Sequence, residues 1–185
     1  MVSTNNLKNG MTVKVDGQLW RVEYFQHVKP GKGGAFVRTT LKGIESGKTI
    51  DKTFRAGEDL EQAILERRNL QYLYREGEQF VFMDTETFDQ SYVPAESIGD
   101  AAKWIRDGDT VELVFYGDEV IDANLPASVE LAVTDTEPGV QGDRVSSATK
   151  PATLETGAVV NVPLFIEPGE RIKVDTRSAT YLSRA

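Results

Sequence analysis

The sequence predicts an all-β protein built from small barrels or sandwiches. Apolar and polar residues alternate in runs rich in Val, Thr, Ile and aromatic side chains, which is typical of half-buried strands. Turn-forming residues separate these runs, and many short strands with frequent turns are typical of barrels and sandwiches. The chain has 185 residues, of which 39% are hydrophobic and 27% charged, as in an ordinary globular protein.

The alternating runs and turns define the elements in chain order. Strands are expected over residues 11–15, 18–28, 35–43, 79–84 and 110–116. Turns are expected at Asp16-Gly17, Ser46-Gly47, Glu76-Gly77, Tyr116-Gly117-Asp118 and Glu137-Pro138-Gly139. Asp16-Gly17 is the best candidate for a two-residue hairpin loop, because such loops need residues that tolerate positive φ.

One helix is expected, from about Ala95 to Ile105. Pro94 is a helix-start signal and Asp107-Gly108 is a stop signal. The apolar stripe that would face the core consists of Ile98, Ala101, Ala102 and Ile105. We interpret this single short helix as a packing lid on a barrel.

Composition excludes several kinds of chemistry. The chain has no cysteine and one histidine, His27, so disulfides, thiol catalysis and a zinc site are not expected. We predict no metal and no cofactor. The N-terminus reads MVSTNNLKNG, which is not apolar enough for a signal peptide or a membrane span. We therefore expect a cytoplasmic protein without a membrane partner.

The charges divide the chain into three segments with breaks near Glu66 and Pro126. Residues 1–64 contain 10 basic residues (Lys and Arg) and 7 acidic residues (Asp and Glu). Residues 65–127 contain 5 basic and 14 acidic residues, and residues 128–185 contain 6 basic and 8 acidic residues. The net charge of −8 therefore comes mainly from the middle segment. Phosphate contacts need Lys and Arg, and the N-terminal segment keeps an excess of them.

The stretch HVKPGKGGAF, residues 27–36, places Lys32 between two expected strands. Pro30 restricts φ, and Gly31, Gly33 and Gly34 allow positive φ, so the loop is expected to protrude as a narrow finger. A phosphate-binding P-loop is disfavoured because Gly33 follows the lysine, and nothing nearby suggests the pocket of a catalytic lysine. Two interpretations stay open: a cationic probe that enters a nucleic-acid cavity, and a flexible hairpin tip that happens to contain lysine.

Long strings across the whole chain resemble the bacterial elongation factor P family. They are KPGKGGAF, DKTFRAGEDLE, NLQYLYREGEQFVFMDTETFDQ and KPATLETGAVVNVPLFIEPGERIKVDTR. The resemblance implies an SH3-like barrel over residues 1–65, which holds the Lys32 finger, followed by two OB-fold barrels over residues 66–127 and 128–185.

The resemblance also implies a function. Members of this family are translation factors, not enzymes. They bind both ribosomal subunits between the peptidyl and exit sites, beside the peptidyl-tRNA, and promote peptide-bond formation at consecutive prolines. Lys32 matches the tip residue, which a lysine-modifying enzyme extends in many members, and Pro30, Gly31, Gly33 and Gly34 match its scaffold. A monomer is expected, because the factor must enter a cleft of the ribosome.

Further residues are candidates for RNA contacts. Lys29 and Arg38 are candidates on charge, whereas Trp20, Tyr24, Phe25 and Phe36 are expected in the barrel interior. By resemblance, Tyr181 and Arg184 match a closing Tyr-x-x-Arg. The loop with Gly142, Asp143 and Arg144 matches one that approaches messenger RNA in the exit site. The family has Thr where this chain has Arg144. Two interpretations therefore stay open: Arg144 contacts a phosphate, or the contact with messenger RNA is lost.

Two alternative functions remain at this point. A paralogous factor of the same architecture would act on other stalls, but such paralogues commonly lack a lysine in a PGKGG context. A non-ribosomal OB-fold protein would bind oligonucleotides and should show aromatic residues among Lys and Arg on its barrel faces, whereas the middle segment is acidic.

Overall fold

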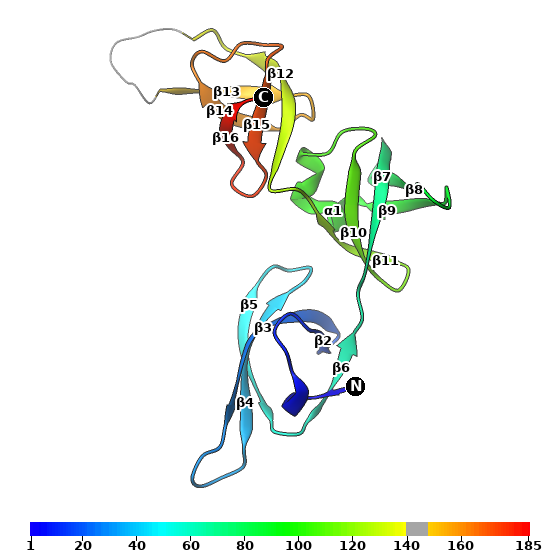
Figure 1. Ribbon diagram of the computed structural model, residues 1–185, viewed down its shortest axis with the longest axis vertical. Coiled ribbons are helices and arrows are strands. Elements are labelled where there is room, and N and C mark those ends of the chain that lie inside the picture. The colour runs from blue at the N-terminus through cyan, green and yellow to red at the C-terminus, as the bar shows by residue number, and fades with distance from the viewer. Residues whose placement is uncertain (140–147) are drawn as a thin grey trace. The chain divides into compact units, whose positions relative to one another are not determined.

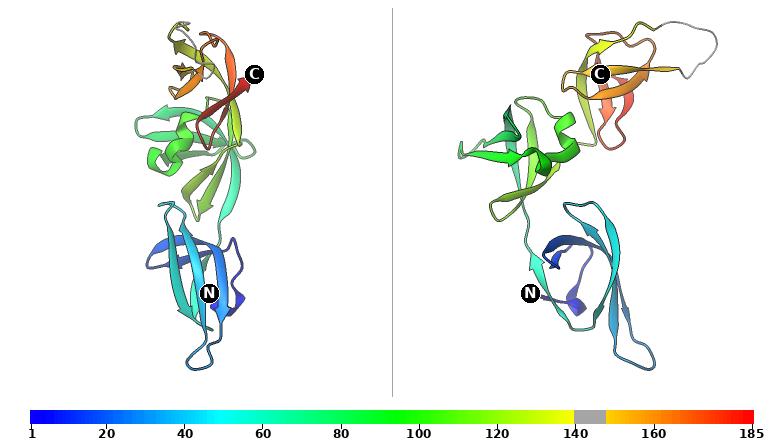
Figure 2. Two further views of the ribbon diagram at one scale, coloured as in Figure 1. Left: turned by 90° about the vertical axis from the view of Figure 1, so that its left-hand side faces the viewer. Right: turned by 180° about the vertical axis from the view of Figure 1, so that it is seen from behind.

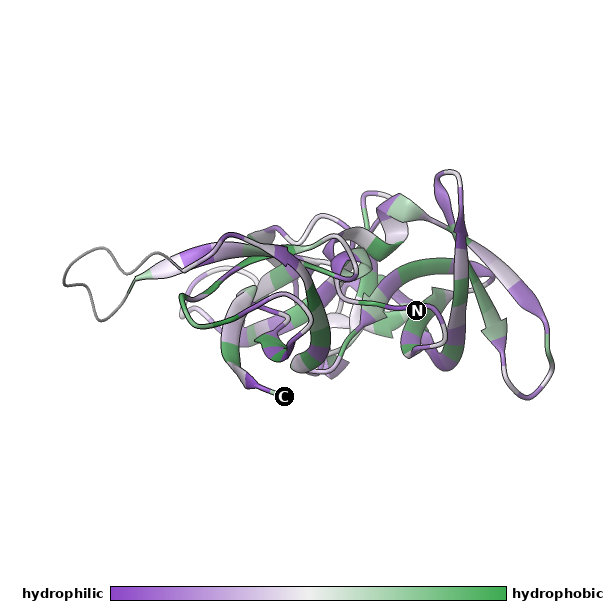
Figure 3. Cartoon of the chain, turned by 90° about the horizontal axis from the view of Figure 1, so that it is seen from above, coloured by the Kyte–Doolittle hydropathy of each residue, from purple (hydrophilic) through white to green (hydrophobic). Residues whose placement is uncertain are grey.

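The computed structural model describes residues 1–139 and 148–185 (Figure 1), and it confirms the predicted all-β fold. The strands form three sheets. Hydrophobic and hydrophilic residues alternate along many of these strands (Figure 3), so that one face of each sheet is buried. Among the described residues, no helix is long and apolar enough to cross a membrane.

The first sheet has the strand order β1-β6-β2-β3-β4-β5. Its core includes the fully buried side chains of Val13, Val22, Val37 and Leu41. The bounds are β1 Val2–Ser3, β2 Thr12–Val15, β3 Gln18–Val28, β4 Phe36–Gly43, β5 Thr49–Arg55 and β6 Asp59–Ala63, with a 3₁₀ turn, η1, over Thr4–Asn6. The predicted hairpin loop is confirmed, since Val15 pairs with Gln18 and both Asp16 (φ 52°) and Gly17 (φ 77°) have positive φ.

The second sheet has the strand order β11-β10-β7-β8-β9. The bounds are β7 Glu66–Glu76, β8 Gln79–Asp84, β9 Gln90–Pro94, β10 Thr110–Tyr116 and β11 Glu119–Asn124. Tyr72 packs its ring against both Phe80 and Phe82, with centroids 5.5 and 5.4 Å away. Burial raises the pKa of the Tyr72 hydroxyl, and the nearby Asp107 carboxylate adds to the rise.

The expected helix is shorter than predicted. The α-helix α1 covers only Ala95–Ile98, and a 3₁₀ turn, η2, continues over Gly99–Lys103. Gly99 has φ +58° and ψ −137°, which lies outside the α-helical region and which glycine adopts readily because it has no Cβ atom. Ile98 and Ile105 are buried as expected, but the side chain of Trp104 is buried as well, at 4% exposure.

The third sheet has the strand order β14-β13-β12-β15-β16. Its core includes Leu131, Leu154, Val162, Ile166 and Ile172, and Trp104 packs into the same cluster. The bounds are β12 Ser128–Thr136, β13 Thr149–Leu154, β14 Val159–Pro163, β15 Arg171–Asp175 and β16 Thr180–Arg184.

By their internal contacts, these residues form two compact units. The first unit comprises Met1–Arg68 and Leu113–Asp122, and the second comprises Asn69–Glu112 and Ala123–Ala185. In the first unit, Val114 and Ile121 pack with Leu19 and Ala63. The division therefore runs through the second sheet, whose residues contribute to the packing of both units.

Candidate nucleic-acid interface

The hairpin of β3 and β4 holds the candidate site. Both views in Figure 2 show this hairpin projecting beyond the rest of its sheet. Eight backbone pairs tie the two strands together, from Trp20 opposite Gly43 to Val28 opposite Phe36, and β5 continues the sheet on the far side of β4. The hairpin is thus a hydrogen-bonded extension of the sheet, with the Lys32 loop at its end.

The tip itself is exposed. Every residue from Lys29 to Gly34 is exposed, and no carboxylate in the described part of the chain lies within ion-pair distance of Lys32. Of the three tip glycines, only Gly33 has positive φ, at +106°. Gly31 and Gly34 therefore do not use the positive φ that glycine allows. A Cβ atom at either position would have nothing within 4 Å, so the folded chain itself does not require glycine there.

A one-residue bulge in β3 decides which side chains face outward. The pairing register shifts between Val22, opposite Leu41, and Tyr24, opposite Thr40. Side chains alternate along a strand, and a bulge reverses the alternation beyond it. Trp20 before the bulge and Phe25 after it pack with the core, as predicted.

The same bulge overturns two interior assignments. Tyr24 is 55% exposed, and by register it lies on the outward face of the sheet. Phe36 is half-buried and shares that face, since the inward position next to it is Val37, which is fully buried. We call the outward side chains of Tyr24, Phe36, Arg38, Thr40, Lys42 and Arg55 the outer face of the hairpin.

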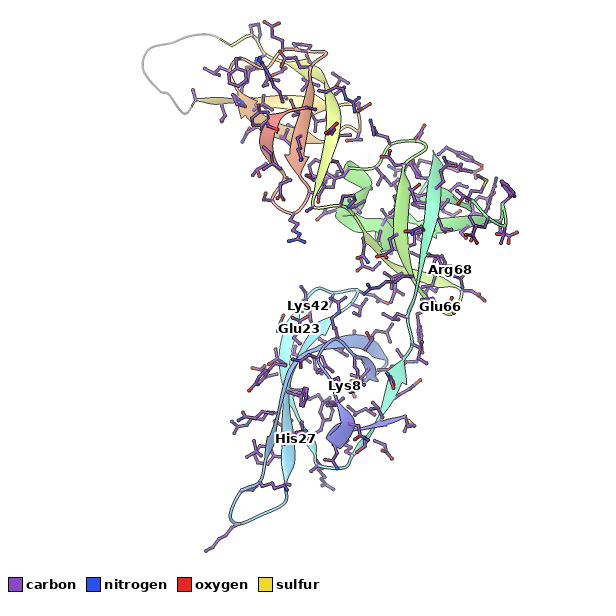
Figure 4. All side chains as sticks on the ribbon, viewed as in Figure 1. Lys8, Glu23, His27, Lys42, Glu66 and Arg68 are labelled. Atoms are coloured by element: carbon purple, nitrogen blue, oxygen red, sulfur yellow. The ribbon has the colours of Figure 1, made fainter. Side chains whose placement is uncertain are left out.

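On the opposite side of the hairpin, the histidine has a neighbour from its own strand. The rings of Phe25 and His27 are edge to face, with centroids 5.6 Å apart. Figure 4 shows His27 nearer to the tip than Lys42 and Glu23, which are labelled at the far end of the sheet. His27 therefore lies at the root of the finger, in an aromatic contact.

The cations of this region are mostly without carboxylate partners. Among the ten Lys and Arg residues of segment 1–64, Lys52 is the one that forms an ion pair with a described residue, at 2.9 Å from Asp16. In segment 65–127, by contrast, Arg68, Arg75, Lys103 and Arg106 all lie in ion pairs. The basic segment can therefore offer its charges to an outside anion.

A hollow in the second unit is a weaker candidate for an anion site. It has a volume of about 900 Å³, and Arg75, Lys103 and Arg106 line it. Arg106 lies between Asp109 and Glu155, at 3.4 and 3.6 Å, and the other two cations are also paired. An incoming phosphate would have to displace these carboxylates.

The C-terminal candidates already have partners within the chain. The guanidinium of Arg184 is 3.1 Å from a Glu170 carboxylate oxygen and stacks 4.7 Å from the centre of the Phe165 ring. Tyr181 packs against the core of the third sheet. Their contact with RNA stays a prediction. Gly142, Asp143 and Arg144 lie outside the described residues.

The outer face holds three cations: Arg38, Lys42 and Arg55. Of these, only Arg38 was named from the sequence as a candidate for RNA contact. Lys42 could be found by alternation, since it is four residues beyond Arg38 on the same strand. Arg55 could not, because its place beside the hairpin depends on the pairing of β5 with β4, where it lies opposite Phe36.

Comparison with solved structures shows what class of protein has this arrangement. The chain is similar to eukaryotic translation initiation factor 5A from Methanococcus jannaschii, with a TM-score of 0.53 and 26% identity, over 66% of this chain and 89% of that one. A translation initiation factor 5A family protein from Naegleria fowleri has a TM-score of 0.55 at 16% identity, which shows likeness of fold alone. By name, both neighbours belong to the translation initiation factor 5A proteins.

Sequence comparison identifies the family. Residues 3–60 match the elongation factor P KOW-like domain, residues 65–123 the elongation factor P OB domain, and residues 129–184 the elongation factor P C-terminal domain. The chain therefore belongs to the elongation factor P family. Proteins named elongation factor P from Acidothermus cellulolyticus and Microcystis aeruginosa are 57% and 53% identical, each over 100% of this chain and 99% and 100% of their own lengths.

Proposed function

We propose that this chain binds the ribosome between the peptidyl and exit sites and promotes peptide-bond formation at consecutive prolines by positioning the peptidyl-tRNA. One observation supports this most strongly: an exposed lysine on a projecting hairpin whose neighbouring cations have no carboxylate partners among the described residues. Membership of the elongation factor P family supports the same function.

The proposed mechanism is positional. Proline has a secondary amine and a restricted φ, so at a run of prolines the two substrates are easily misplaced for reaction. A factor that holds the peptidyl-tRNA restores the advantage of proximity and orientation. Lys32 would supply a cation beside the CCA end, and the protein would act as neither acid, base nor nucleophile. We therefore propose a factor without enzymatic activity of its own, which acts as a monomer in the cytoplasm.

The tip residue is also the proposed position of modification. The Lys32 side chain is exposed and is bracketed by Gly31 and Gly33, so a lysine-modifying enzyme could reach the amine from several sides. We further propose that the three sheets correspond to barrels over residues 1–65, 66–127 and 128–185. Support comes from the separate pairing of each sheet and from the three matched family domains.

Reconstituted translation tests the proposed function. The wild-type protein should speed synthesis of a peptide with three consecutive prolines and leave synthesis of a matched proline-free peptide unchanged, because only the first reaction is limited by substrate positioning. Time courses with and without the factor measure both effects. Equal rates on the proline message with and without the protein would remove the proposed function.

Removing Lys29 or Arg38, the cations next to the tip, should change how ribosome binding depends on salt. Arg38→Ala or Lys29→Ala should weaken ribosome binding and reduce the salt slope of log affinity by about 1, as expected for one lost phosphate contact. Lys52→Ala is the matched control, because Lys52 is already paired with Asp16 and should change the slope little. Ribosome binding measured over a series of salt concentrations gives the slope for each variant. An unchanged slope in both Arg38→Ala and Lys29→Ala would contradict the proposal that these residues contact phosphates.

A further inference from the structure

The β10–β11 hairpin is buried on both of its faces. Leu113, Val114 and Phe115 are consecutive residues of β10, and all three are at most 5% exposed. Because side chains alternate along a strand, Val114 lies on the face opposite to Leu113 and Phe115. In β11, Val120 and Ile121 are likewise adjacent and both buried. A hairpin that packed only against its own sheet would leave every second side chain exposed, so another element of the chain covers the face that holds Val114.

The first sheet covers this face. Val114 and Ile121 pack with Leu19 of β3 and Ala63 of β6, and we call these four side chains the joint cluster. Leu19 lies on the side of β3 opposite to Trp20, which packs in the core of the first sheet. The joint cluster therefore connects the outward side of the first sheet to the outward side of the β10–β11 hairpin.

Further contacts surround the joint cluster. The partly buried side chains of Ile44, Leu65 and Tyr116 pack against it, and the backbone N–H of Ile44 donates a hydrogen bond to the Leu19 carbonyl at 3.0 Å. Residues 113–122 fall within the match to the family's OB domain, yet by their contacts they belong to the unit that carries the finger. The hairpin is thus part of the structure on which the finger is built.

Strand β3 connects the joint cluster to the finger. Leu19 is the second residue of this strand, and Val28 is its last residue before the tip loop. The strand between them spans about 30 Å at about 3.3 Å per residue, so a rotation of about 2° at Leu19 displaces the far end by about 1 Å. A displacement of about 1 Å can slow a reaction that depends on proximity and orientation by about 100-fold. Small changes at the joint cluster are therefore large enough at the tip to affect such a reaction.

We propose that the joint cluster positions the finger for peptide-bond formation, and that Ile121 is a positioning residue. Ile121 is 7% exposed, so it acts through β3 and not by a contact with RNA. Fixing the β10–β11 hairpin to the first sheet fixes the direction in which β3 carries Lys32. The inference rests on the proposed function, since it takes Lys32 to work beside the peptidyl-tRNA. A cluster that only stabilised the fold would leave the maximal rate with folded, saturating factor unchanged.

The rate of triple-proline synthesis, measured over a range of factor concentrations, tests the positioning role. Ile121→Ala should lower the maximal acceleration by about ten-fold, as for a displacement of less than about 1 Å. The half-saturating concentration should change by less than about two-fold, because the exposed cations are unchanged. Ile121→Val keeps a branched side chain in the joint cluster and should recover most of the maximal acceleration. Ile166→Ala is the matched control: Ile166 is fully buried in the core of the third sheet, so the same atoms are removed outside the joint cluster.

Distance measurements test the joint cluster without translation. The chain has no cysteine, so Gln26→Cys on β3 and Asp118→Cys in the β10–β11 turn would place two nitroxide spin labels at exposed positions of the first unit. Double electron–electron resonance on the full chain should give one narrow distance distribution. Ile121→Ala should broaden this distribution, and Ile166→Ala should leave it unchanged. If circular dichroism shows that Ile121→Ala is unfolded, Val114→Ala, which removes fewer atoms from the same cluster, takes its place with the same expected results.

The two measurements separate the joint cluster from the proposed function. An unchanged distance distribution in Ile121→Ala would overturn the proposal, and so would a broadened distribution with the full maximal acceleration. Equal losses of maximal acceleration in Ile121→Ala and Ile166→Ala would assign the loss to stability and also overturn it. If wild type does not speed synthesis from the proline message, the proposed function is wrong, and the distance distributions alone decide whether the joint cluster holds the finger in place.

Discussion

Lys32→Ala is expected to abolish most of the acceleration of triple-proline synthesis while leaving the fold intact. The Lys32 side chain is exposed and has no ion-pair partner in the described part of the chain, so its interactions would form only on the ribosome. Its loss should change the free energy of unfolding by no more than about 0.5 kcal/mol, as is usual for an exposed position. Translation time courses on the proline message, together with thermal unfolding, measure the two effects.

A second exposed lysine in the same barrel is the control for this variant. Lys48 is exposed in the turn between β4 and β5, so Lys48→Ala removes one positive charge from the segment but leaves the finger unchanged. It should retain the wild-type acceleration. If Lys32→Ala rescued the proline message as well as wild type does, the finger would have to act without its lysine. If both variants lost activity equally, total charge rather than the tip would be responsible.

The largest expected effect on stability comes from Trp104→Ala. Trp104 is buried to 4% exposure and belongs to the core that Leu131, Val162 and Ile172 form in the third sheet. Truncating a buried aromatic side chain removes its transfer free energy and leaves a cavity, which together cost about 3–5 kcal/mol. Out of a total stability of about 5–15 kcal/mol for a domain, this is a large share. Urea unfolding followed by circular dichroism measures the loss.

The side chains around Trp104 provide the comparison. Trp104→Phe keeps an aromatic ring and should lose less than Trp104→Ala. Lys103→Ala, at a lysine whose side chain is 60% exposed, should stay within about 0.5 kcal/mol of wild type. The Thr156 hydroxyl donates to the Lys103 backbone carbonyl, a contact that the Lys103 substitution preserves. A Trp104→Ala protein as stable as Lys103→Ala would show that the tryptophan does not hold the core together.

Trp104 also explains why the middle segment cannot be treated as a separate acidic module. Trp104, which belongs to the middle segment, is part of the core of the third sheet within the second unit. Within the first unit, its Val114 and Ile121 pack with Leu19 and Ala63. A fragment of residues 65–127 alone would expose both sets of apolar side chains, so functional tests belong on the full chain.

By itself, the sequence determined part of the local structure, and it determined the family. Strands 18–28, 79–84 and 110–116 appear with the predicted bounds, and Asp16-Gly17 forms the predicted loop with two positive φ angles. These features are encoded locally, in side-chain alternation and in residues that tolerate special φ. The resemblance to elongation factor P was also evident from long strings of the sequence, and the family matches confirm that resemblance.

Only the tertiary structure decided which side chains face a partner. Alternation alone would put Tyr24 inside with Trp20 and Val22, but the bulge before it turns the ring outward. A bulge has no reliable signature in the sequence, because it arises from the pairing of two strands. Arg55 reaches the outer face, and Arg184 finds Glu170 and Phe165, through partners that are distant along the chain. Such contacts depend on how strands pair and pack, a choice that residue spacing along one strand does not encode.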